Sequence, residues 1–365
     1  MATTLANVHG RRTTMSMRGV AGVAAMVVVA VGLSTRTVHT QRGGSALSRE
    51  PACNTLAMAS TGGPMPKNPN TLVFRWLGTA NQEIVFRDMV ILLDGHYDRP
   101  PRTRPLGFTK DDIKRVNAFF VGHGASPHSD HISEVPYVAQ RTGAKVYAAK
   151  NQIDAAKALG LPDNQAVTVK GGEIEEFHGF VVEPIRARHA ILREGATEKI
   201  GPIYKDDPLS DAEKARAEQF ARDDSEFAKA HPSEPQPPGY PMMGYLFTFD
   251  SGFKLMWLDT AGPITDEERQ KMQQIGTTDV AVVSYQGQII ADWQIDATLP
   301  FVKLFKPRYF IPTHHDQLGA TFLDMATYPL FMAIRDQVPG TKTVDVMYRT
   351  PVCFDVKTKE MYVGP

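Results

Sequence analysis

The sequence has little of what marks several common protein classes. Its 365 residues contain two cysteines and no C-x-x-C motif, and no internal repeat is visible. Forty Lys and Arg balance forty Asp and Glu, and no basic run is interleaved with aromatic residues. A nucleic-acid partner is therefore not expected, and attraction of a small-molecule substrate would have to be local. At this length a large α/β sandwich can form one domain around a substantial core.

The N-terminal region lacks acidic residues before Glu50, and it lacks an apolar run long enough to span a bilayer. Three arginines precede an uncharged run from Val20 to Leu33, which has 14 residues where a transmembrane helix needs about 20. A basic segment before a short apolar one is typical of a secretory signal peptide. We therefore predict a signal in residues 1–40 and an exported protein, periplasmic or secreted. Membrane anchoring through residues 20–33 of an uncleaved signal is the alternative.

The segment after the signal is rich in Gly, Ser, Pro and Thr, and it has little apolar periodicity. Residues 41–70 are therefore expected to form a flexible linker. Cys53 in this segment and Cys353 near the C-terminus could form one disulfide in an oxidising compartment. Two separate free thiols are the alternative, because the sequence does not give the distance between them.

The folded body is expected to begin near Thr71, where short apolar runs bounded by Gly, Asp or Pro start to recur. Helical stretches lie between these runs, and this mixture predicts a layered α/β architecture. The predicted strands are Thr71–Leu77, Ile84–Phe86, Met89–Leu93, Ala118–Val121, Lys145–Ala149, Phe180–Ile185, Gly244–Phe249, Lys254–Leu258, Val280–Tyr285, Tyr309–Ile311, Val344–Tyr348 and Met361–Val363. The predicted helices are Lys110–Asn117, Ser133–Thr142, Gln152–Ala158, Thr265–Gln274 and Tyr328–Gln337.

A charged segment interrupts this pattern at about residues 193–241 and ends in a proline-rich stretch. Ser210 and Glu213 form a capping box, which predicts that a mostly polar helix follows. We interpret the segment as a helical insertion in the domain. It is either a lid over the functional site or a solvated surface helix.

The stretch from His123 to His131 holds three histidines and one aspartate within nine residues. His128, Asp130 and His131 stand close together near its end. Imidazole nitrogen and carboxylate oxygen are ligands that suit zinc and similar divalent ions. Side chains of adjacent residues diverge, so Asp130 and His131 can serve different ions. The stretch predicts a metal site, and two metal ions are conceivable.

Three further candidate ligands stand where a predicted strand stops. His189 follows Val-Val-Glu-Pro-Ile-Arg-Ala-Arg, Asp259 follows Leu-Met-Trp-Leu, and His314 follows Tyr-Phe-Ile-Pro-Thr. A side chain at the end of a strand can emerge from a packed sheet into a cleft, and sites gather on such loops.

In this order, the histidine-rich loop and the three strand-end residues resemble the metallo-β-lactamase superfamily, whose loop motif is H-x-H-x-D-H. The resemblance extends from Thr71 to the C-terminus. It is strongest to the branch of metal-dependent hydrolases similar to ascorbate-phosphate lactonase, through Gly78-Thr79-Ala80-Asn81, Leu92-Leu93-Asp94 and Ile311-Pro312-Thr313-His314. The resemblance implies a four-layered αββα sandwich with the metals at one edge of the paired sheets.

The resemblance also implies a ligand set. It assigns His123, His128 and His189 to the first metal, Asp130, His131 and His314 to the second, and Asp259 to a bridging position. This chain departs from the motif, because His123 and His128 are five residues apart where the family has two. We favour an insertion of Ala125-Ser126-Pro127, in which Pro127 turns the chain so that His123 reaches back. The alternative places Ser126 in the first ligand position.

The expected activity is hydrolysis by a metal-bridging hydroxide, formed because two divalent ions lower the pKa of water from about 15.7 toward about 7. The hydroxide would attack an ester, lactone, amide or phosphoester, with Asp130 orienting it and passing its proton to the leaving group. Two zinc ions are expected, although the ligand types also suit iron or manganese. An iron-dependent oxidoreductase on the same scaffold is one alternative, but the flavin-linked diiron branch has a loop Glu that this stretch lacks. A catalytically silent metal-binding protein is the other.

Overall fold

A computed structural model of the chain describes residues 46–99, 104–124, 129–190, 241–285, 291–316 and 326–365, and five helical residues between 211 and 222. The chain divides into two units, Met1–Arg42 and Gly43–Pro365, and the fold below is that of the second. The predicted signal and most of the predicted insertion lie outside the described residues. Within the ranges that are described, no helix has the length and apolar character needed to cross a bilayer.

The first of two sheets has eight strands in the order β15-β14-β1-β2-β3-β4-β5-β6. The pairings make β1, β3 and β4 run in the same direction, so their carboxyl ends lie at one edge of this sheet. The strands are β1 (Thr71–Trp76), β2 (Gln82–Phe86), β3 (Met89–Leu93), β4 (Ala118–Phe120), β5 (Lys145–Ala148), β6 (Ala166–Thr168), β14 (Val352–Asp355) and β15 (Met361–Val363).

The second sheet has seven strands in the order β13-β12-β11-β10-β9-β8-β7. Here β8, β10, β11 and β12 run in the same direction, so their carboxyl ends also share an edge. The strands are β7 (Glu175–Phe177), β8 (Phe180–Arg188), β9 (Pro241–Phe249), β10 (Lys254–Leu258), β11 (Val280–Ser284), β12 (Tyr309–Thr313) and β13 (Lys342–Thr343).

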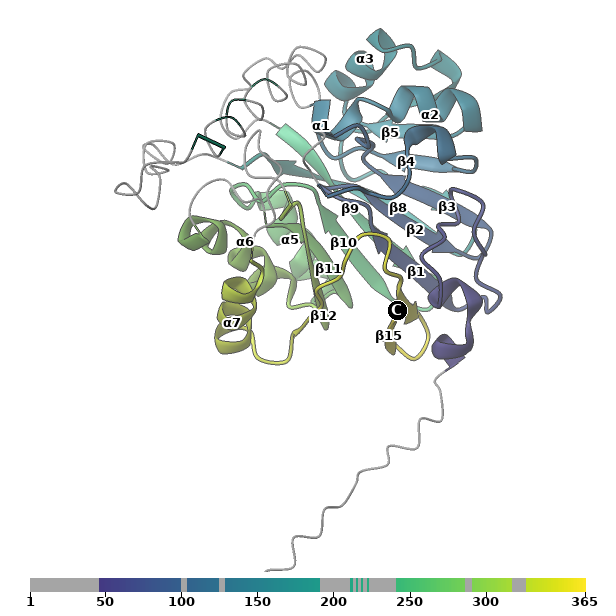
Figure 1. The fold of residues 1–365 in the computed structure, drawn as a ribbon. Helices are drawn as coiled ribbons and strands as arrows, with labels where there is room; N and C mark the ends of the chain where they lie inside the picture. The colour runs from purple at the N-terminus through teal and green to yellow at the C-terminus, as the bar shows by residue number, and fades with distance from the viewer. Residues whose placement is uncertain are drawn as a thin grey trace, which may run out of the picture. The chain divides into compact units, whose positions relative to one another are not determined.

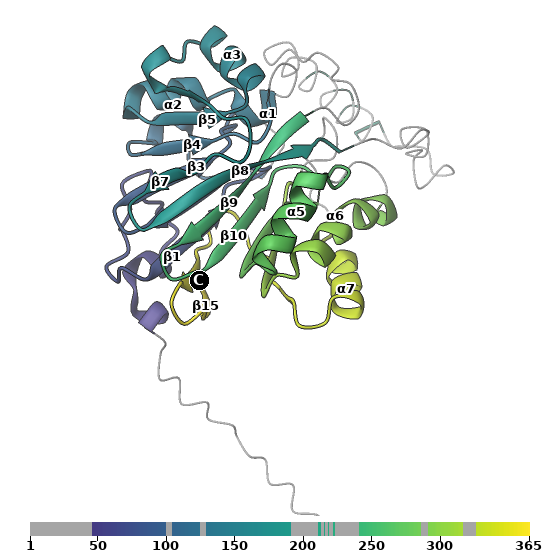
Figure 2. The same ribbon diagram turned by 180° about the vertical axis from the view of Figure 1, so that it is seen from behind.

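Helices cover the outer faces of both sheets (Figures 1 and 2). Helices α2 and α3 lie beside the first sheet, and α5, α6 and α7 lie against the second, where their apolar faces pack on strands β8 to β12. The helices are α1 (Ser129–Ile132), α2 (Val135–Thr142), α3 (Lys150–Ala158), α5 (Asp266–Ile275), α6 (Ala291–Phe305) and α7 (Tyr328–Gln337), with short 3-10 helices η1 (Ala46–Arg49), η2 (Pro51–Cys53), η3 (Lys110–Asp112) and η4 (Asp163–Gln165). The predicted αββα sandwich is confirmed.

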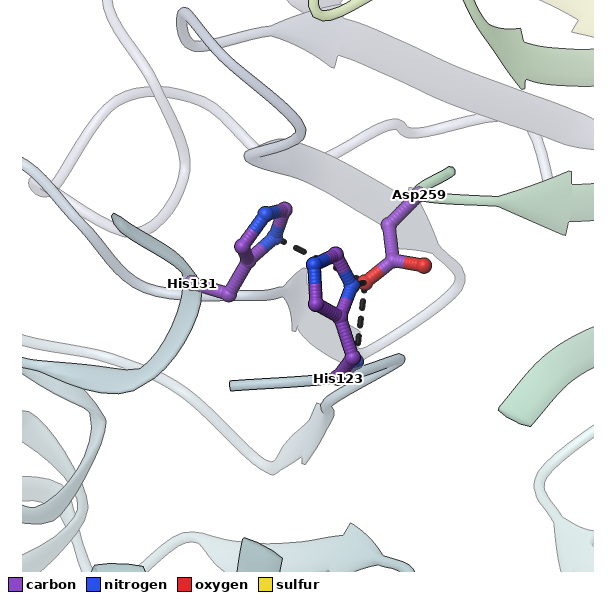
Figure 3. Close-up of side chains that lie close together, drawn as sticks. All are labelled: His123, His131 and Asp259. Atoms are coloured by element: carbon purple, nitrogen blue, oxygen red, sulfur yellow. Dashed lines mark hydrogen bonds and ion pairs between the residues drawn. The ribbon is translucent and has the colours of Figure 1, made fainter. Parts of the chain in front are cut away.

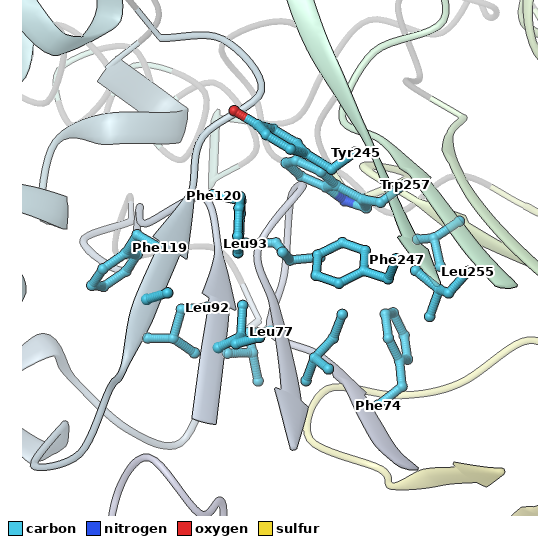
Figure 4. Packing of buried hydrophobic residues seen from close by; sticks show 14 of the residues in the cluster. Phe74, Leu77, Leu92, Leu93, Phe119, Phe120, Tyr245, Phe247, Leu255 and Trp257 are labelled. Atoms are coloured by element: carbon cyan, nitrogen blue, oxygen red, sulfur yellow. The ribbon is translucent and has the colours of Figure 1, made fainter. Parts of the chain in front are cut away.

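An aromatic core fills the space between the sheets (Figure 4). Phe120 of the first sheet lies edge-on to Phe247 of the second, with ring centroids 5.5 Å apart, and Phe86 contacts Phe249 in the same way at 4.8 Å. Each such side chain buries about 150–250 Å². This core gives the loops at the sheet edges a rigid support.

The segment expected to be a flexible linker is ordered from residue 46 onward, where it forms η1 and η2 and packs against the first sheet. Cys53 and Cys353 form a disulfide, with their Cα atoms 6.0 Å apart, so the free-thiol alternative is wrong. Leu47 and Ala52 are buried with Val73 on the outer face of the first sheet. The composition hid this packing, because a single disulfide and a few small side chains hold the segment in place of a periodic apolar face.

Two other local predictions are wrong. Only η3 forms in the predicted helix Lys110–Asn117, because the backbone N–H groups of Lys114 and Arg115 donate to the carbonyl of Ser60. The predicted strand Val344–Tyr348 is irregular. Its alternating apolar side chains are buried, but beyond Val344 its backbone does not pair with a neighbouring strand.

Candidate metal centre

The predicted ligands converge because of the strand directions. His189, Asp259 and His314 each follow directly the last residue of a strand, β8, β10 and β12 respectively. Since these strands run the same way, the three residues lie at one edge of the second sheet. His123 lies just beyond β4 of the first sheet and meets them there.

His123, His131 and Asp259 form the centre of the cluster (Figure 3). All three are buried, and one ligand atom from each lies within 4.8 Å of the others. The Nδ1 atom of His123 is 2.5 Å from Oδ2 of Asp259, and the backbone N–H of His123 donates to the same oxygen at 2.8 Å. The two imidazole rings are 3.7 Å apart between centroids. The loop after β4 of the first sheet, helix α1 and the loop after β10 of the second sheet therefore bring nitrogen and oxygen donors to one point.

His189 joins the cluster with a defined orientation. Its ring centroid is 4.8 Å from that of His123. Its Nδ1 lies 2.8 Å from the carbonyl oxygen of Ala190, so Nδ1 carries the proton and Nε2 presents its lone pair. The hydroxyl of Thr260 accepts the N–H of Ala190 at 3.1 Å and holds this bend of the chain. A metal-binding histidine needs such a partner for its second ring nitrogen.

His131 and His314 face each other with the separation that a shared ion requires. The Nδ1 of His131 is 2.7 Å from Oδ2 of Asp94, which leaves Nε2 as the donor atom for a metal. This Nε2 is 3.3 Å from Nε2 of His314. Two nitrogen ligands of one tetrahedral zinc ion, each at about 2.0–2.1 Å, are roughly 3.3 Å apart. The residues therefore fit a divalent ion.

The charge balance of the cluster also fits a cation. Asp94 and Asp259 are fully buried, and Oδ1 of Asp259 accepts no hydrogen bond from the described residues. Burial raises the pKa of Asp94 well above its usual value, and the nearby charge of Asp259 raises it further. Burial likewise raises the pKa of Asp259, although the neighbouring histidines oppose this effect. Bound cations favour the ionised form of both carboxyl groups.

The backbone around the cluster is adapted to close contact. A Cβ atom on Gly122 would lie 2.3 Å from the carboxyl carbon of Asp259, so only glycine fits there. Asp94 and His314 have positive φ angles of 54° and 63°. Such backbone conformations are uncommon for residues other than glycine, and they cluster at functional sites.

Two predicted ligands, His128 and Asp130, lie wholly or partly outside the part of the chain that the structure describes. His128 and the alternative ligand Ser126 lie outside the described residues, and Asp130 is described only by its backbone, which belongs to α1. The position of His123 against Asp259 is compatible with the favoured insertion. The roles of His128 and Asp130 stay predictions.

Asp94 and Thr260 are site residues to which the sequence analysis assigned no role. Asp94 was noted only as part of a family motif, yet it directly follows the buried strand β3. The strand-end signal that marked Asp259 was therefore present for Asp94 as well. Thr260 gave no signal of its own, because its partner is the backbone of a residue 70 positions away.

A pocket of about 580 Å³ lies away from the metal cluster. It is lined by residues that precede β11, β12 and β13, such as Thr278, Arg308 and Thr341. The metal cluster lies where the parallel strands end, which is the opposite edge of the sheet.

Comparisons with known proteins agree with this fold and this cluster. No family model matches the chain. A UPF0173 metal-dependent hydrolase of Cupriavidus necator is 24% identical over 258 residues, which covers 67% of this chain and 75% of the relative. Another UPF0173 metal-dependent hydrolase, from Polynucleobacter asymbioticus, is 22% identical over 263 residues, covering 70% and 79%. The structure of Igni18, a metallo hydrolase from Ignicoccus hospitalis, matches with a TM-score of 0.52 and 15% identity, covering 78% of this chain and 98% of that one.

The two packed sheets with a histidine-rich cluster at their edge have the metallo-β-lactamase fold that the sequence predicted. Both of these curated relatives are named metal-dependent hydrolases, which agrees with the enzyme class expected from the sequence. The predicted similarity to the ascorbate-phosphate lactonase branch is not confirmed by these relatives.

Proposed function

We propose that the protein is an exported hydrolase with two divalent metal ions, most simply zinc, that cleaves an ester, lactone, amide or phosphoester of a small molecule. The observation that carries the proposal is the facing pair of Nε2 atoms of His131 and His314 at 3.3 Å, beside Asp259. A second carboxylate, Asp94, fixes the tautomer of His131.

The described residues divide between two ion positions. His123 and His189 would hold one ion, His131 and His314 the other, and Asp259 lies between His123 and His131 and would touch both. Ions held there supply a hydroxide nucleophile at neutral pH and polarise the substrate oxygen that is attacked. The chain itself orients the ligands: Asp94 and the Ala190 carbonyl keep the Nδ1 protons of His131 and His189 away from the metal side.

Asp130 is the proposed proton carrier. It directly precedes His131 in the sequence, and both residues belong to α1. A carboxylate in that place can accept a proton from the attacking water and pass it to the leaving group. No side-chain nucleophile is needed for this reaction class.

Export is supported by the disulfide between Cys53 and Cys353, because disulfides persist mainly in oxidising compartments. Cleavage of a signal in residues 1–40 can be tested by mass spectrometry of the protein recovered from cells. A mature chain that begins after residue 30 supports secretion, whereas an intact N-terminus in the membrane fraction supports anchoring.

The activity is tested by metal analysis together with substrate panels. We expect two equivalents of zinc per chain and hydrolysis in at least one of the ester, lactone, amide and phosphodiester panels. Asp130→Ala should retain most of the metal and lose turnover, while the exposed control Asp250→Ala should change neither. Fewer than one zinc per chain, or unaltered hydrolysis by Asp130→Ala, contradicts the proposal. Iron with visible absorption would favour the oxidoreductase alternative instead.

A further inference from the structure

A buried ion pair lies beside the metal centre and has no assigned role. The guanidinium of Arg99 is 2.8 Å from the carboxylate of Asp316, and both side chains are almost completely buried. The hydroxyl of Tyr348 donates to the same carboxylate at 2.6 Å, and Arg99 also donates to that hydroxyl at 3.0 Å. Burying such a pair is unfavourable unless further hydrogen bonds complete it, so its presence needs an explanation.

The carboxylate of Asp316 binds the backbone of the turn between β1 and β2. The N–H of Thr79 donates to both of its oxygens, at 2.9 Å and 3.1 Å. Thr79 has a positive φ of 45°, which is uncommon for a threonine. The preceding residue, Gly78, has no space for a side chain, because a Cβ atom there would lie 2.7 Å from Arg99. The ion pair therefore holds a strained turn in place.

The same turn holds a metal ligand. The carbonyl of Thr79 accepts the N–H of His314 at 2.8 Å and the hydroxyl of Thr313 at 2.7 Å. His314 itself has a positive φ, and this backbone bond fixes where its ring starts. Hydrogen bonds thus connect Asp316 to the N–H of Thr79, and the carbonyl of the same residue to the ligand His314.

We propose that Asp316, paired with Arg99, is a positioning residue for the metal centre: it holds the turn at Thr79, and the turn holds His314 opposite His131. The proposal rests on the proposed metal-dependent function. Burial raises the pKa of Asp316, but Arg99 and the hydrogen bonds of Tyr348 outweigh that effect, and the net pKa is lowered. The carboxylate is therefore charged and a strong acceptor.

The chain offers a matched control in a second buried pair. Arg75 is 3.0 Å from Glu83, and both side chains are fully buried. Glu83 also accepts two backbone N–H groups, but these belong to Ala59 and Ser60 in the N-terminal segment. The chemistry matches that at Asp316, whereas among the residues that the structure describes no hydrogen bond of this pair leads to a metal ligand.

The test is zinc affinity of the full chain, measured by competition with a chromophoric chelator. We expect Asp316→Asn to weaken one of the two zinc equivalents by about 10–100-fold, the usual effect of losing a partner that orients a ligand. Tyr348→Phe removes one of the hydrogen bonds to the Asp316 carboxylate, and it should weaken zinc binding by about 2–10-fold. Glu83→Gln should leave both affinities unchanged. Cobalt-substituted Asp316→Asn should also show an altered visible spectrum, because one ligand position is perturbed.

Wild-type affinity in both Asp316→Asn and Tyr348→Phe overturns the proposal. If Asp316→Asn does not fold, Tyr348→Phe decides the question. Hydrogen exchange of the His314 amide in the metal-free protein provides a separate readout: it should be faster in the Asp316 variant and unchanged in Glu83→Gln. A wild-type protein that binds no zinc contradicts the proposed function, and the exchange rates then still decide whether Asp316 holds the turn.

Discussion

The two buried arginine–carboxylate pairs of this protein have nearly the same chemistry and different surroundings. Arg75 and Glu83 sit opposite each other on β1 and β2 and bind the N-terminal segment. Arg99 and Asp316 are 217 residues apart and bind the turn beside the metal centre. The comparison shows that the effect of such a pair depends on which part of the molecule contains the backbone groups that it binds. One pair stabilises a peripheral segment, and the other supports a ligand.

The largest expected effect is at the metal centre, where the negative charge of Asp259 should matter for hydrolysis more than for the free energy of unfolding. Asp259→Asn keeps the shape of the side chain but removes the bridging charge, so hydrolysis should fall about 10⁴-fold or more as metal binding is lost. Because burial disfavours the ionised Asp259, the free energy of unfolding of the metal-free variant should be unchanged or higher. Chelator-treated samples in urea, together with kcat/KM, measure both quantities. A large loss of stability in the metal-free variant would contradict this prediction, because it would show that the charge of Asp259 stabilises the fold.

The opposite behaviour is expected at the peripheral pair. Glu83→Gln leaves the buried guanidinium of Arg75 without its charge partner, which should lower the free energy of unfolding by about 3–5 kcal/mol. Activity and zinc content of the folded fraction should not change. Urea titration with circular dichroism gives the stability, and Glu176→Gln, at an exposed position, provides a baseline. A tenfold drop in zinc affinity at unchanged fold would break the distinction between the two pairs.

A third region, the start of α5, should make the free energy of unfolding depend on pH through one buried carboxyl group, that of Glu268. Burial raises the pKa of Glu268 to about 7, although the hydrogen bonds that its carboxyl group accepts from Thr265 in the capping box oppose this effect. A raised acid pKa favours the protonated form in the folded protein. Its contribution is therefore complete below the unfolded pKa of about 4.3 and is lost as pH rises through about 7, by up to about 3 kcal/mol.

Glu268→Gln should remove this dependence. The stability difference between wild type and variant, measured in urea from pH 4.5 to 8, should shift in favour of the variant as pH rises. Glu360→Gln, at an exposed position outside α5, should keep the wild-type slope. A flat difference for Glu268→Gln would show that this carboxyl group titrates normally.

The smallest expected effect is at Thr260. Thr260→Val removes the acceptor for the N–H of Ala190, and the bend that orients His189 should loosen. One hydrogen bond contributes about 1 kcal/mol, so zinc affinity should fall by about 2–10-fold. Thr298→Val, an equally buried threonine whose hydroxyl donates to the carbonyl of Ser284, should alter stability alone. Equal zinc affinity in both variants would remove Thr260 from the support of the centre.

The strand-end rule explains why much of the site could be predicted. His189, Asp259 and His314 each directly follow the last residue of a strand, and strands that run in the same direction place such residues at one edge of the sheet. The same rule extends to Asp94. It could not reach Asp316, whose partners Thr79 and Arg99 are more than 200 residues away and become neighbours only when the two sheets pack.

The fold was predictable where burial is continuous and less so where packing overrides local signals. Helix α6 was missed although it has 15 residues, and Pro300 lies inside it. Proline disfavours a helix interior, but the apolar face of α6 packs on the second sheet and stabilises it. Strand β14 was missed because its pairing with β1 depends on a partner almost 300 residues away.

The central claim is that residues from both sheets form one metal centre, and a zinc-soaked crystal measured at the zinc absorption edge tests it most directly. The account predicts anomalous peaks at the sheet edge, one bound by Nε2 of both His131 and His314, with Asp259 beside it. It also predicts that His123 and His189 bind a second ion. Peaks only on surface residues, or an ion bound by His131 without His314, would contradict it.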